Sequence, residues 1–203
     1  MIKEVVLATG NKGKVKEFSN LLEGVFGEII SLSDLGSPPE VIEDGLTFRD
    51  NALKKAREIA QYSGKLTLAD DSGLEVDALN GQPGVYSARY SGEGATDKTN
   101  IDKVLAKLGN NPNRKARFVC VLALVDPNGE ELVVEGFCEG VILSKPRGEG
   151  GFGYDPVFYL PDKRKTMAEL EPELKNTSSH RANALKKLKT ELERKGSFKK
   201  SYN

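Results

Sequence analysis

The chain has 203 residues, of which 38% are hydrophobic, and its 30 basic residues balance its 30 acidic residues. This length is sufficient for one substantial core, so we expect a large single domain with two lobes over residues 1–195, followed by a basic, frayed tail over residues 196–203. The balanced charge argues against binding to a nucleic-acid polymer and favours a small charged ligand.

The N-terminal residues and the cysteines are those expected of a cytoplasmic protein. The first eight residues are too short and too charged for a signal peptide, and no apolar run approaches the roughly 20 residues that span a bilayer. We therefore expect no membrane partner. Cys120 and Cys138 lie in apolar runs that could face each other across a hairpin, but a reducing compartment favours free, buried thiols.

A glycine-containing loop follows the first predicted strand. Residues 3–8 form an apolar run, and apolar residues recur at helical spacing over residues 15–22. The loop between them, residues 9–14, would present backbone N–H groups and the positive end of a helix dipole to an anion, with charge added by Lys12 and Lys14. The alternative is a plain connection with solvated lysines. The loop does not match the phosphate-binding pattern GxxxxGK[ST].

A second strand and a capped helix come next. Residues 28–32 predict a short strand, and Glu43 and Asp44 then stand beside a glycine. A capping-box pattern opens a helix over residues 47–62, whose small alanines indicate close packing. Glu43 and Asp44 could serve a metal ion, or they could be a solvated acid and a turn residue.

Two adjacent carboxylates end the next apolar run. Residues 66–69 read as a buried strand that stops at Asp70 and Asp71, which are followed by serine and glycine. Because adjacent strand residues point to opposite faces, one carboxylate could face a ligand crevice while the other braces its surroundings. Together with Glu43 they offer the oxygen ligands that Mg²⁺ prefers. The alternative is a turn in which these side chains cap their own backbone.

The middle of the chain reads largely as scaffold. Residues 73–79 alternate as a half-exposed strand does, and the long loop over residues 80–92 contains aromatic and cationic groups that indicate order. A threonine-capped helix over residues 96–108 ends at a glycine. Residues 116–125 and 131–143 form the clearest hairpin.

A second glycine-rich loop precedes the C-terminal helix. Residues 147–156 surround aromatic side chains with glycines, which lets backbone approach a flat ligand; a flexible surface loop is the alternative. A strand follows over residues 157–159, and residues 166–169 form another capping box. His180, the one histidine, stands at the start of the last helix. A histidine at such a position more often caps or packs than takes part in catalysis.

Six short motifs stand out when they are taken together: Thr-Gly-Asn-Lys-Gly-Lys (9–14), Glu-Asp-Gly-Leu-Thr-Phe (43–48), Ala-Asp-Asp-Ser-Gly (69–73), Pro-Gly-Val-Tyr-Ser-Ala-Arg-Tyr-Ser-Gly (83–92), Phe-Gly-Tyr-Asp (152–155) and Ser-His-Arg (179–181). In this order, over nearly the whole chain, they resemble the inosine triphosphate pyrophosphatase family, also called the HAM1-like family. The resemblance implies an α/β fold with a long mixed sheet flanked by helices, a cleft between two lobes, and a homodimer. It also implies Mg²⁺-dependent hydrolysis of ITP, dITP and XTP to the monophosphate and pyrophosphate.

The resemblance further implies a role for each matching residue. Asp71 would accept the proton from water, and Glu43 and Asp71 would hold the metal, with Asp70 as a further candidate. Substrate contacts would come from Thr9, Gly10, Asn11, Lys12, Gly13 and Lys14 on the phosphates, from Ser72, and from Phe152, Gly153, Tyr154, Asp155, Lys175, His180 and Arg181 on the base.

The chemistry of the substrate class fits these residue types. Release of pyrophosphate by water needs a cation, a carboxylate and fixed donors on the phosphates. A guanidinium such as that of Arg181 can donate to both O6 and N7 of hypoxanthine or xanthine, whereas adenine offers an amino donor at that position. A nucleotide sensor, a nucleic-acid-binding module and a Maf-like pyrophosphatase are the competing classes.

Overall fold

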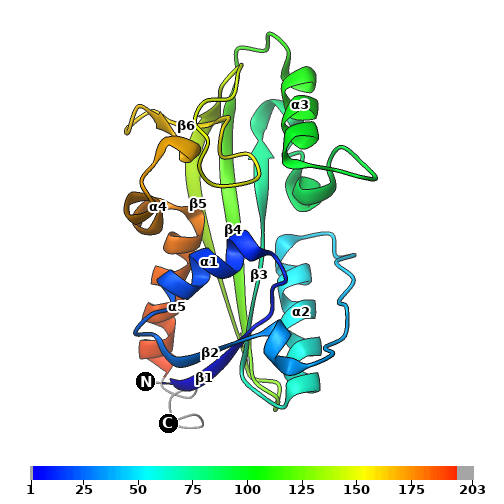
Figure 1. Ribbon diagram of the computed structural model, residues 1–203, viewed down its shortest axis with the longest axis vertical. Helices are drawn as coiled ribbons and strands as arrows, with labels where there is room; N and C mark the ends of the chain where they lie inside the picture. The colour runs from blue at the N-terminus through cyan, green and yellow to red at the C-terminus, as the bar shows by residue number, and fades with distance from the viewer. Residues whose placement is uncertain (1, 196–203) are drawn as a thin grey trace. The chain divides into compact units, whose positions relative to one another are not determined.

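The protein is a mixed α/β structure, described for residues 2–195 by a computed structural model. The tail over residues 196–203, expected to be frayed, lies outside the described residues. The strands form one seven-stranded sheet in the order β2-β1-β3-β4-β5-β6-β7 (Figure 1). They are β1 (Ile2–Leu7), β2 (Phe26–Ser31), β3 (Thr67–Val76), β4 (Lys115–Val125), β5 (Glu131–Ile142), β6 (Phe158–Leu160) and β7 (Lys165–Thr166).

The sheet mixes parallel and antiparallel pairs. Strand β1 pairs in parallel with β2 and with β3, whereas β6 pairs antiparallel with both β5 and β7. The predicted α/β class and long mixed sheet are therefore confirmed.

Helix boundaries follow the local signals in the sequence. The helices are α1 (Lys12–Leu21), α2 (Phe48–Ser63), α3 (Asp97–Leu108), α4 (Pro172–Ser178) and α5 (His180–Lys195), with short 3-10 segments η1 (Leu32–Leu35), η2 (Asp77–Leu79), η3 (Gly84–Arg89) and η4 (Met167–Glu169). Thr47 and Thr96 cap α2 and α3 as predicted, and Gly109 ends α3 with φ +48°. Within residues 2–195, no helix combines the length and apolar character of a transmembrane segment.

The chain divides into two compact units, each built from separate segments. Unit 1 comprises Met1–Asp71, Cys120–Gly136 and Arg181–Asn203, and unit 2 comprises Ser72–Val119 and Phe137–His180. Strands β3, β4 and β5 each contribute residues to both units. That the units make a single domain over the predicted range stays a prediction.

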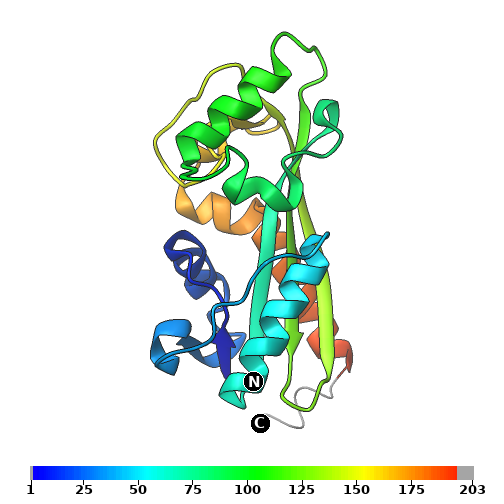
Figure 2. The ribbon, with the colours of Figure 1, turned by 90° about the vertical axis from the view of Figure 1, so that its right-hand side faces the viewer.

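Unit 1 has helices on both faces of its part of the sheet. In Figures 1 and 2, α1 and α5 lie on one face and α2 lies on the other. Phe18 of α1 and Leu185 and Leu188 of α5 join one buried cluster with Leu68 of β3. Each such side chain stabilises the fold by about 1.5–3 kcal/mol when it leaves water. This packing fixes α1 and α5 against the strand that carries the acidic pair.

Unit 2 packs α3 on its strands. Ile101 and Val104 of α3 share a buried cluster with Leu74, Phe118 and Phe158. The rings of Phe118 and Phe158 are 4.3 Å apart between centroids and tilted by 35°, a favourable aromatic arrangement. This second core supports the glycine-rich loop that precedes β6.

The two cysteines, whose pairing the sequence left open, are free and buried. Cys120 belongs to the core cluster of unit 1 and Cys138 to that of unit 2. Burial raises the pKa of both thiols, that of Cys138 to about 11, so both stay protonated at neutral pH and act as small apolar side chains.

One predicted strand boundary was wrong. The strand expected to stop at Asp70 continues as β3 to Val76, so the carboxylates lie in mid-strand and the turn alternative is excluded as well. Strand β1 pairs with β3 only as far as Leu68, so pairing with β4 on the other side continues the strand and overrides the turn preference of Asp, Ser and Gly. The half-exposed strand predicted over residues 73–79 is the second half of β3 followed by η2. Helix α4, which begins at a proline, was not predicted.

Candidate active site

Asp70 and Asp71 lie next to each other in β3, yet their side chains contact different helices. Lys14 of α1 is the partner of Asp70, and Asn51 of α2 is the partner of Asp71. Since α1 and α2 cover opposite faces of the sheet, the predicted alternation of the two side chains is confirmed. The two carboxylates therefore have different contact partners and can have separate roles, although the charges of Lys14 and Lys55 act on both.

Asp70 is a fully buried carboxylate that is charged at neutral pH. Its Oδ2 lies 2.8 Å from Lys14 Nζ, and its side chain is 0% exposed. Burial alone would raise the pKa of Asp70, but the nearby charges of Lys14, Lys55 and Arg181 lower it to about 2. Asp70 thus provides a fixed negative charge that holds these cations in place.

Replacing Asp70 by asparagine should lower the free energy of unfolding by about 3–5 kcal/mol, because buried cations lose their counter-charge. For a chain of this length the melting temperature should fall by roughly 6–20 °C. The lowered pKa means that this stabilisation is present above pH 3.8 and is lost as the pH falls through about 2. As a control, Asp102→Asn breaks an exposed pair with Lys98 and should cost less than about 1 kcal/mol. Equal melting temperatures for the two variants would contradict the role of Asp70.

Asp71 is a buried carboxylate whose pKa is raised toward neutral pH. Its side chain accepts a hydrogen bond from Asn51 Nδ2 at 3.0 Å, and the residue is 5% exposed. Burial raises the pKa of Asp71 to about 6, although the charges of Lys55 and Lys14 oppose this rise. A carboxylate with such a pKa can accept a proton and give it up again near neutral pH, as a general base requires.

Two residues of α2 that sequence reasoning missed organise these acids. Lys55 Nζ lies 2.6 Å from Glu43 Oε1; burial would lower the pKa of Lys55, but Asp70, Glu43 and Asp71 together raise it. Lys55 and Asn51 are polar residues four positions apart that fall on the buried face of α2. This break in an apolar face was the signal that could have identified them.

Asn51 also fixes the loop that carries Glu43. Its Oδ1 accepts a hydrogen bond from Gly45 N at 2.8 Å, while its Nδ2 donates to Asp71. A Cβ at Gly45 would come within 2.6 Å of that same Oδ1, so only glycine allows this approach. One amide thus ties the acidic loop to β3.

The loop over residues 9–14 forms the start of α1. Asn11 caps the helix by accepting from Lys14 N at 3.1 Å, and Thr9 Oγ1 accepts from Asn11 N at 3.3 Å. Helix α1 therefore begins at Lys12, earlier than the apolar pattern predicted. Gly10, Asn11 and Lys12 are exposed, whereas Lys14 turns inward to Asp70.

His180 and Arg181 are consecutive residues that belong to different units. His180, in unit 2, stacks on Phe118 with 4.8 Å between ring centroids. Arg181, in unit 1, is 4% exposed and lies 2.8 Å from Glu17 Oε2 of α1. Glu17 was missed by sequence reasoning, since nothing in the local pattern pairs residues 164 positions apart.

The predicted base-binding residues of unit 2 share a buried ion pair. Asp155 Oδ2 accepts from Lys175 Nζ at 2.7 Å and from Phe152 N at 3.1 Å. Lys175 Nζ also lies 5.1 Å from the centre of the Phe152 ring, within range of a cation–π contact. The structure therefore brings three of these residues together in unit 2.

Two further contacts hold this loop. Gly153 N donates to Asp97 Oδ2 at 2.7 Å, and Tyr154 Oη donates to the main-chain carbonyl of Ser87 at 2.8 Å. Ser87 Oγ in turn accepts from Leu74 N at 2.9 Å. The motif over residues 83–92, to which the sequence assigned no role, thus supports Tyr154. Ser72, the first residue of unit 2, is half-buried in β3 directly after Asp71.

The acidic residues of unit 1 suit a hard cation bound with water and phosphate. Within the described part of the chain, no three His, Cys, Asp or Glu side chains are grouped to hold a metal ion by themselves. Mg²⁺, however, usually takes only one or two carboxylates. Burial destabilises the charged form of Asp71 and so raises its pKa, and a bound cation would stabilise that charged form. Glu43 and Asp71 therefore fit such an ion.

A mixed sheet that carries a buried carboxylate of raised pKa beside lysines and further acids marks an α/β protein with a candidate catalytic site. The chain belongs to the Ham1 family, whose model matches residues 5–191. It is 55% identical over 186 residues to the dITP/XTP pyrophosphatase of Desulforamulus reducens, covering 91% of this chain and 92% of that protein. It is 51% identical over 195 residues to the dITP/XTP pyrophosphatase of Bacillus subtilis, covering 95% and 98%.

Solved structures agree with the family assignment. A HAM1 protein from Coxiella burnetii superposes with a TM-score of 0.87 at 44% identity, covering 95% of this chain and 100% of that chain. The Ham1 protein of Staphylococcus aureus gives a TM-score of 0.85 at 46% identity, covering 95% and 99%.

Proposed function

We propose that this protein is a nucleoside triphosphate pyrophosphatase that hydrolyses dITP, ITP and XTP to the monophosphate and pyrophosphate. It would thereby remove deaminated purines from the nucleotide pool and keep them out of DNA and RNA. The observation that carries the proposal is Asp71, a buried carboxylate with a pKa of about 6 inside a cluster of acids and lysines. The names of the relatives, which are dITP/XTP pyrophosphatases, support the substrate class.

Unit 1 is proposed to act on the triphosphate. Asp71 takes the proton from the attacking water, and Asn51 holds its carboxylate in position. Glu43 and Asp71 bind Mg²⁺, which when bound neutralises charge that develops on the phosphates. Asp70 stays a prediction as a further ligand, since its carboxylate is paired with Lys14. The phosphates are bound by residues 9–14 at the start of α1, where Gly10, Asn11 and Lys12 are exposed.

Unit 2 is proposed to bind the base. The side chain of Phe152 stacks on the purine, and Lys175 and Asp155 provide a donor and an acceptor at its edge. Gly153, Tyr154 and His180 are the other proposed base contacts of unit 2. Arg181 is proposed to donate to O6 and N7, and Ser72 is proposed to contact the substrate. A site built on such hydrogen bonds rejects a base that lacks the matching groups.

The deciding experiment is release of pyrophosphate from ITP, dITP and XTP, compared with ATP and GTP, with Mg²⁺ and with EDTA. We expect Mg²⁺-dependent release from the first three and little from the others. Tight binding of ITP without turnover would identify a sensor instead. Turnover restricted to other modified nucleotides would favour a Maf-like enzyme.

Lys14→Ala should raise KM for ITP more than it weakens binding of the monophosphate product, because the charge of Lys14 is proposed to act near the triphosphate tail. Binding of the monophosphate is measured by calorimetry and KM by steady-state kinetics. Lys16→Ala, an exposed lysine on the same helix, is the matched control and should leave both unchanged. Equal weakening of both ligands in Lys14→Ala would move Lys14 away from the tail.

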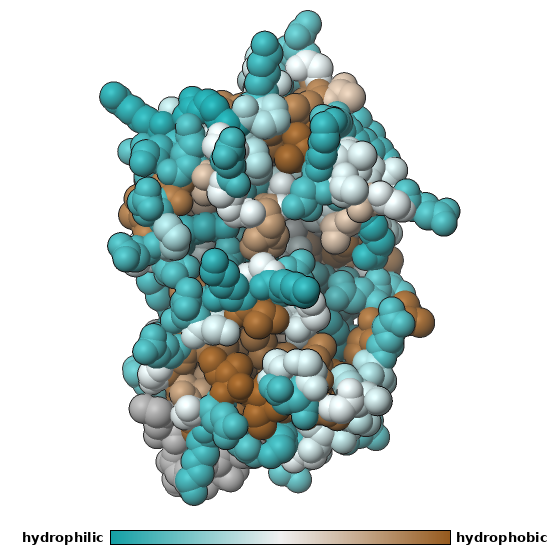
Figure 3. Space-filling view, in the orientation of Figure 1, coloured by the Kyte–Doolittle hydropathy of each residue, from teal (hydrophilic) through white to brown (hydrophobic). Residues whose placement is uncertain are grey.

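We also propose a cytoplasmic homodimer. Hydrophobic side chains gather on the surface of unit 1 between α1 and β2 (Figure 3). Leu21 of α1, Ile29 of β2 and Val25 between them are only partly buried. Such a patch is typical of a surface that another protein covers. Light scattering on the purified protein should give twice the chain mass of 22.1 kDa.

A further inference from the structure

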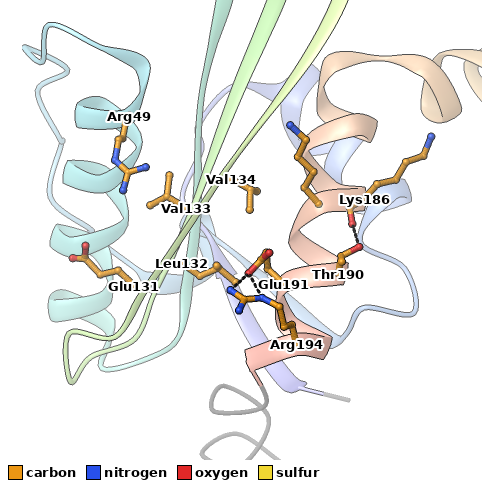
Figure 4. A pocket seen from close by; sticks show the side chains of 10 residues that line it. Arg49, Glu131, Leu132, Val133, Val134, Lys186, Thr190, Glu191 and Arg194 are labelled. Atoms are coloured by element: carbon orange, nitrogen blue, oxygen red, sulfur yellow. Dashed lines mark hydrogen bonds and ion pairs between the residues drawn. The ribbon is translucent and has the colours of Figure 1, made fainter.

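A groove in unit 1 lies along one edge of the sheet, away from the acids of β3. It has a volume of ≈ 720 Å³ and is bordered by Arg49 of α2, residues 131–134 of β5 and one side of α5 (Figure 4). Figure 4 shows β5 running between the two helices, with Arg49 on one side and Arg194 on the other. The proposed function uses none of these residues.

The groove follows a strand edge that has no neighbouring strand there. Within residues 2–195, β5 lies between β4 and β6, and β6 pairs with it only at Val141 and Ile142. The other end of β5, in unit 1, therefore has β4 on one side and the groove on the other.

The hydrogen-bond pattern shows which peptide groups face the groove. Asp126 N of the β4–β5 turn donates to Glu130 O, and further along Ile142 N donates to Arg114 O. Both contacts direct even-numbered residues of β5 toward β4. Since peptide groups alternate along a strand, those of Glu131, Val133 and Glu135 point away from β4. These groups can pair with an added strand.

The walls of the groove are basic. Its lining includes four basic side chains, Arg49, Lys186, Lys187 and Arg194, and two acidic ones. Each acidic side chain has an arginine partner: Glu131 is bound by Arg57, and Glu191 by Arg194. The lining therefore has an excess of two positive charges, in a chain whose overall charge is balanced.

We propose that this groove binds an extended, acidic peptide segment of a partner protein, which adds to β5 as a further strand. The main-chain groups of residues 131–135 would supply the strand hydrogen bonds, and the basic side chains of α2 and α5 would select acidic residues. At about 3.4 Å per residue, five residues span roughly 17 Å. A peptide of about five residues therefore spans the edge, and a heptapeptide extends one residue beyond it at each end.

Charge favours this occupant over a second copy of the chain. If two β5 edges paired antiparallel around Val133, Glu131 of one copy would lie opposite Glu135 of the other, and like charges in that position are destabilising. The same twofold axis would bring the two basic sides of α5 together. An acidic peptide meets neither repulsion.

Fluorescence anisotropy of a labelled heptapeptide with alternating glutamate and valine tests the proposal. The purified full chain should bind it, and binding should weaken as salt is raised. The double variant Lys186→Glu/Lys187→Glu should bind it roughly tenfold or more weakly. Lys189→Glu, an exposed lysine of the same helix outside the groove, is the matched control and should bind like the unchanged protein.

A second variant tests the strand pairing itself. Val133→Pro removes one outward N–H, so it should leave β4–β5 pairing intact but weaken peptide binding. Equal loss of binding in Lys189→Glu, or equal binding of a lysine–valine peptide, would overturn the proposal. So would displacement of the peptide by an equal concentration of tripolyphosphate, which would indicate a small-anion site. Absence of binding would mean that the charges only protect an exposed edge.

Discussion

Asp71→Asn should reduce kcat for ITP by about 10²–10⁴-fold, the usual contribution of a general base. Asparagine keeps the shape of the side chain but cannot accept the proton from water, and it is a poorer ligand for Mg²⁺. The fold should persist, because Asp71 is destabilised by burial as an anion and a neutral amide removes that cost. Initial rates at saturating Mg²⁺, together with the melting temperature of the variant, provide the measurement.

The matched control for this variant is Asp44→Asn. Asp44 lies next to the proposed ligand Glu43, but its own partner is Lys54 at an exposed site. Loss of that pair should change neither kcat nor stability by a measurable amount. Near-native kcat in a folded Asp71→Asn protein would falsify the assignment of Asp71 as the base.

Arg181→Ala should lower the ratio of kcat/KM for ITP to that for ATP by roughly one to two orders of magnitude. A bidentate contact to O6 and N7 is worth about 1–3 kcal/mol of discrimination, at 1.4 kcal/mol per tenfold. Because adenine lacks the acceptor at C6, ATP should lose little. Arg181→Lys should restore only part of the ratio, since lysine lacks the planar fork. Both substrates are measured on each variant.

The structure gives this experiment a definite second outcome. Arg181 is paired with Glu17 and contributes to the low pKa of Asp70. If ITP and ATP lose activity in parallel, the guanidinium serves this charged network and not the base. Glu17→Gln separates the two roles, because it leaves the guanidinium present while it removes its anionic partner.

The elements that local patterns predicted are those set by residues close in sequence. The caps at Thr47 and Thr96 depend on hydrogen bonds that span three residues, and the β4–β5 hairpin depends on its turn. Strand β3 was cut short because Asp70 and its neighbours favour turns locally, whereas pairing with strands distant in sequence decides their conformation. Long-range pairing cannot be read from a short window of sequence.

The same distinction applies to the site. The resemblance identified the residues that match the family's motifs. The structure adds their partners: Lys14 of α1 contacts Asp70, and Asn51 of α2 contacts Asp71. Lys55 and Asn51 lie outside those motifs, and the sequence marks them only as polar residues on an otherwise apolar helix face, without naming their partners. Partner choice across the fold is three-dimensional information that spacing along the chain does not contain.

The contact between Tyr154 and Ser87 affects how mutational scans of this protein should be read. The hydroxyl of Tyr154 donates to a main-chain carbonyl, and every residue type supplies that acceptor. A scan that replaces side chains one at a time leaves this acceptor in place at position 87, so a loss there reports the Ser87 hydroxyl, which accepts from Leu74 N, and not the bond to Tyr154. Tyr154→Phe removes this hydrogen bond directly. Substitutions along η3 therefore report the side chains of that segment and not the contribution of its backbone.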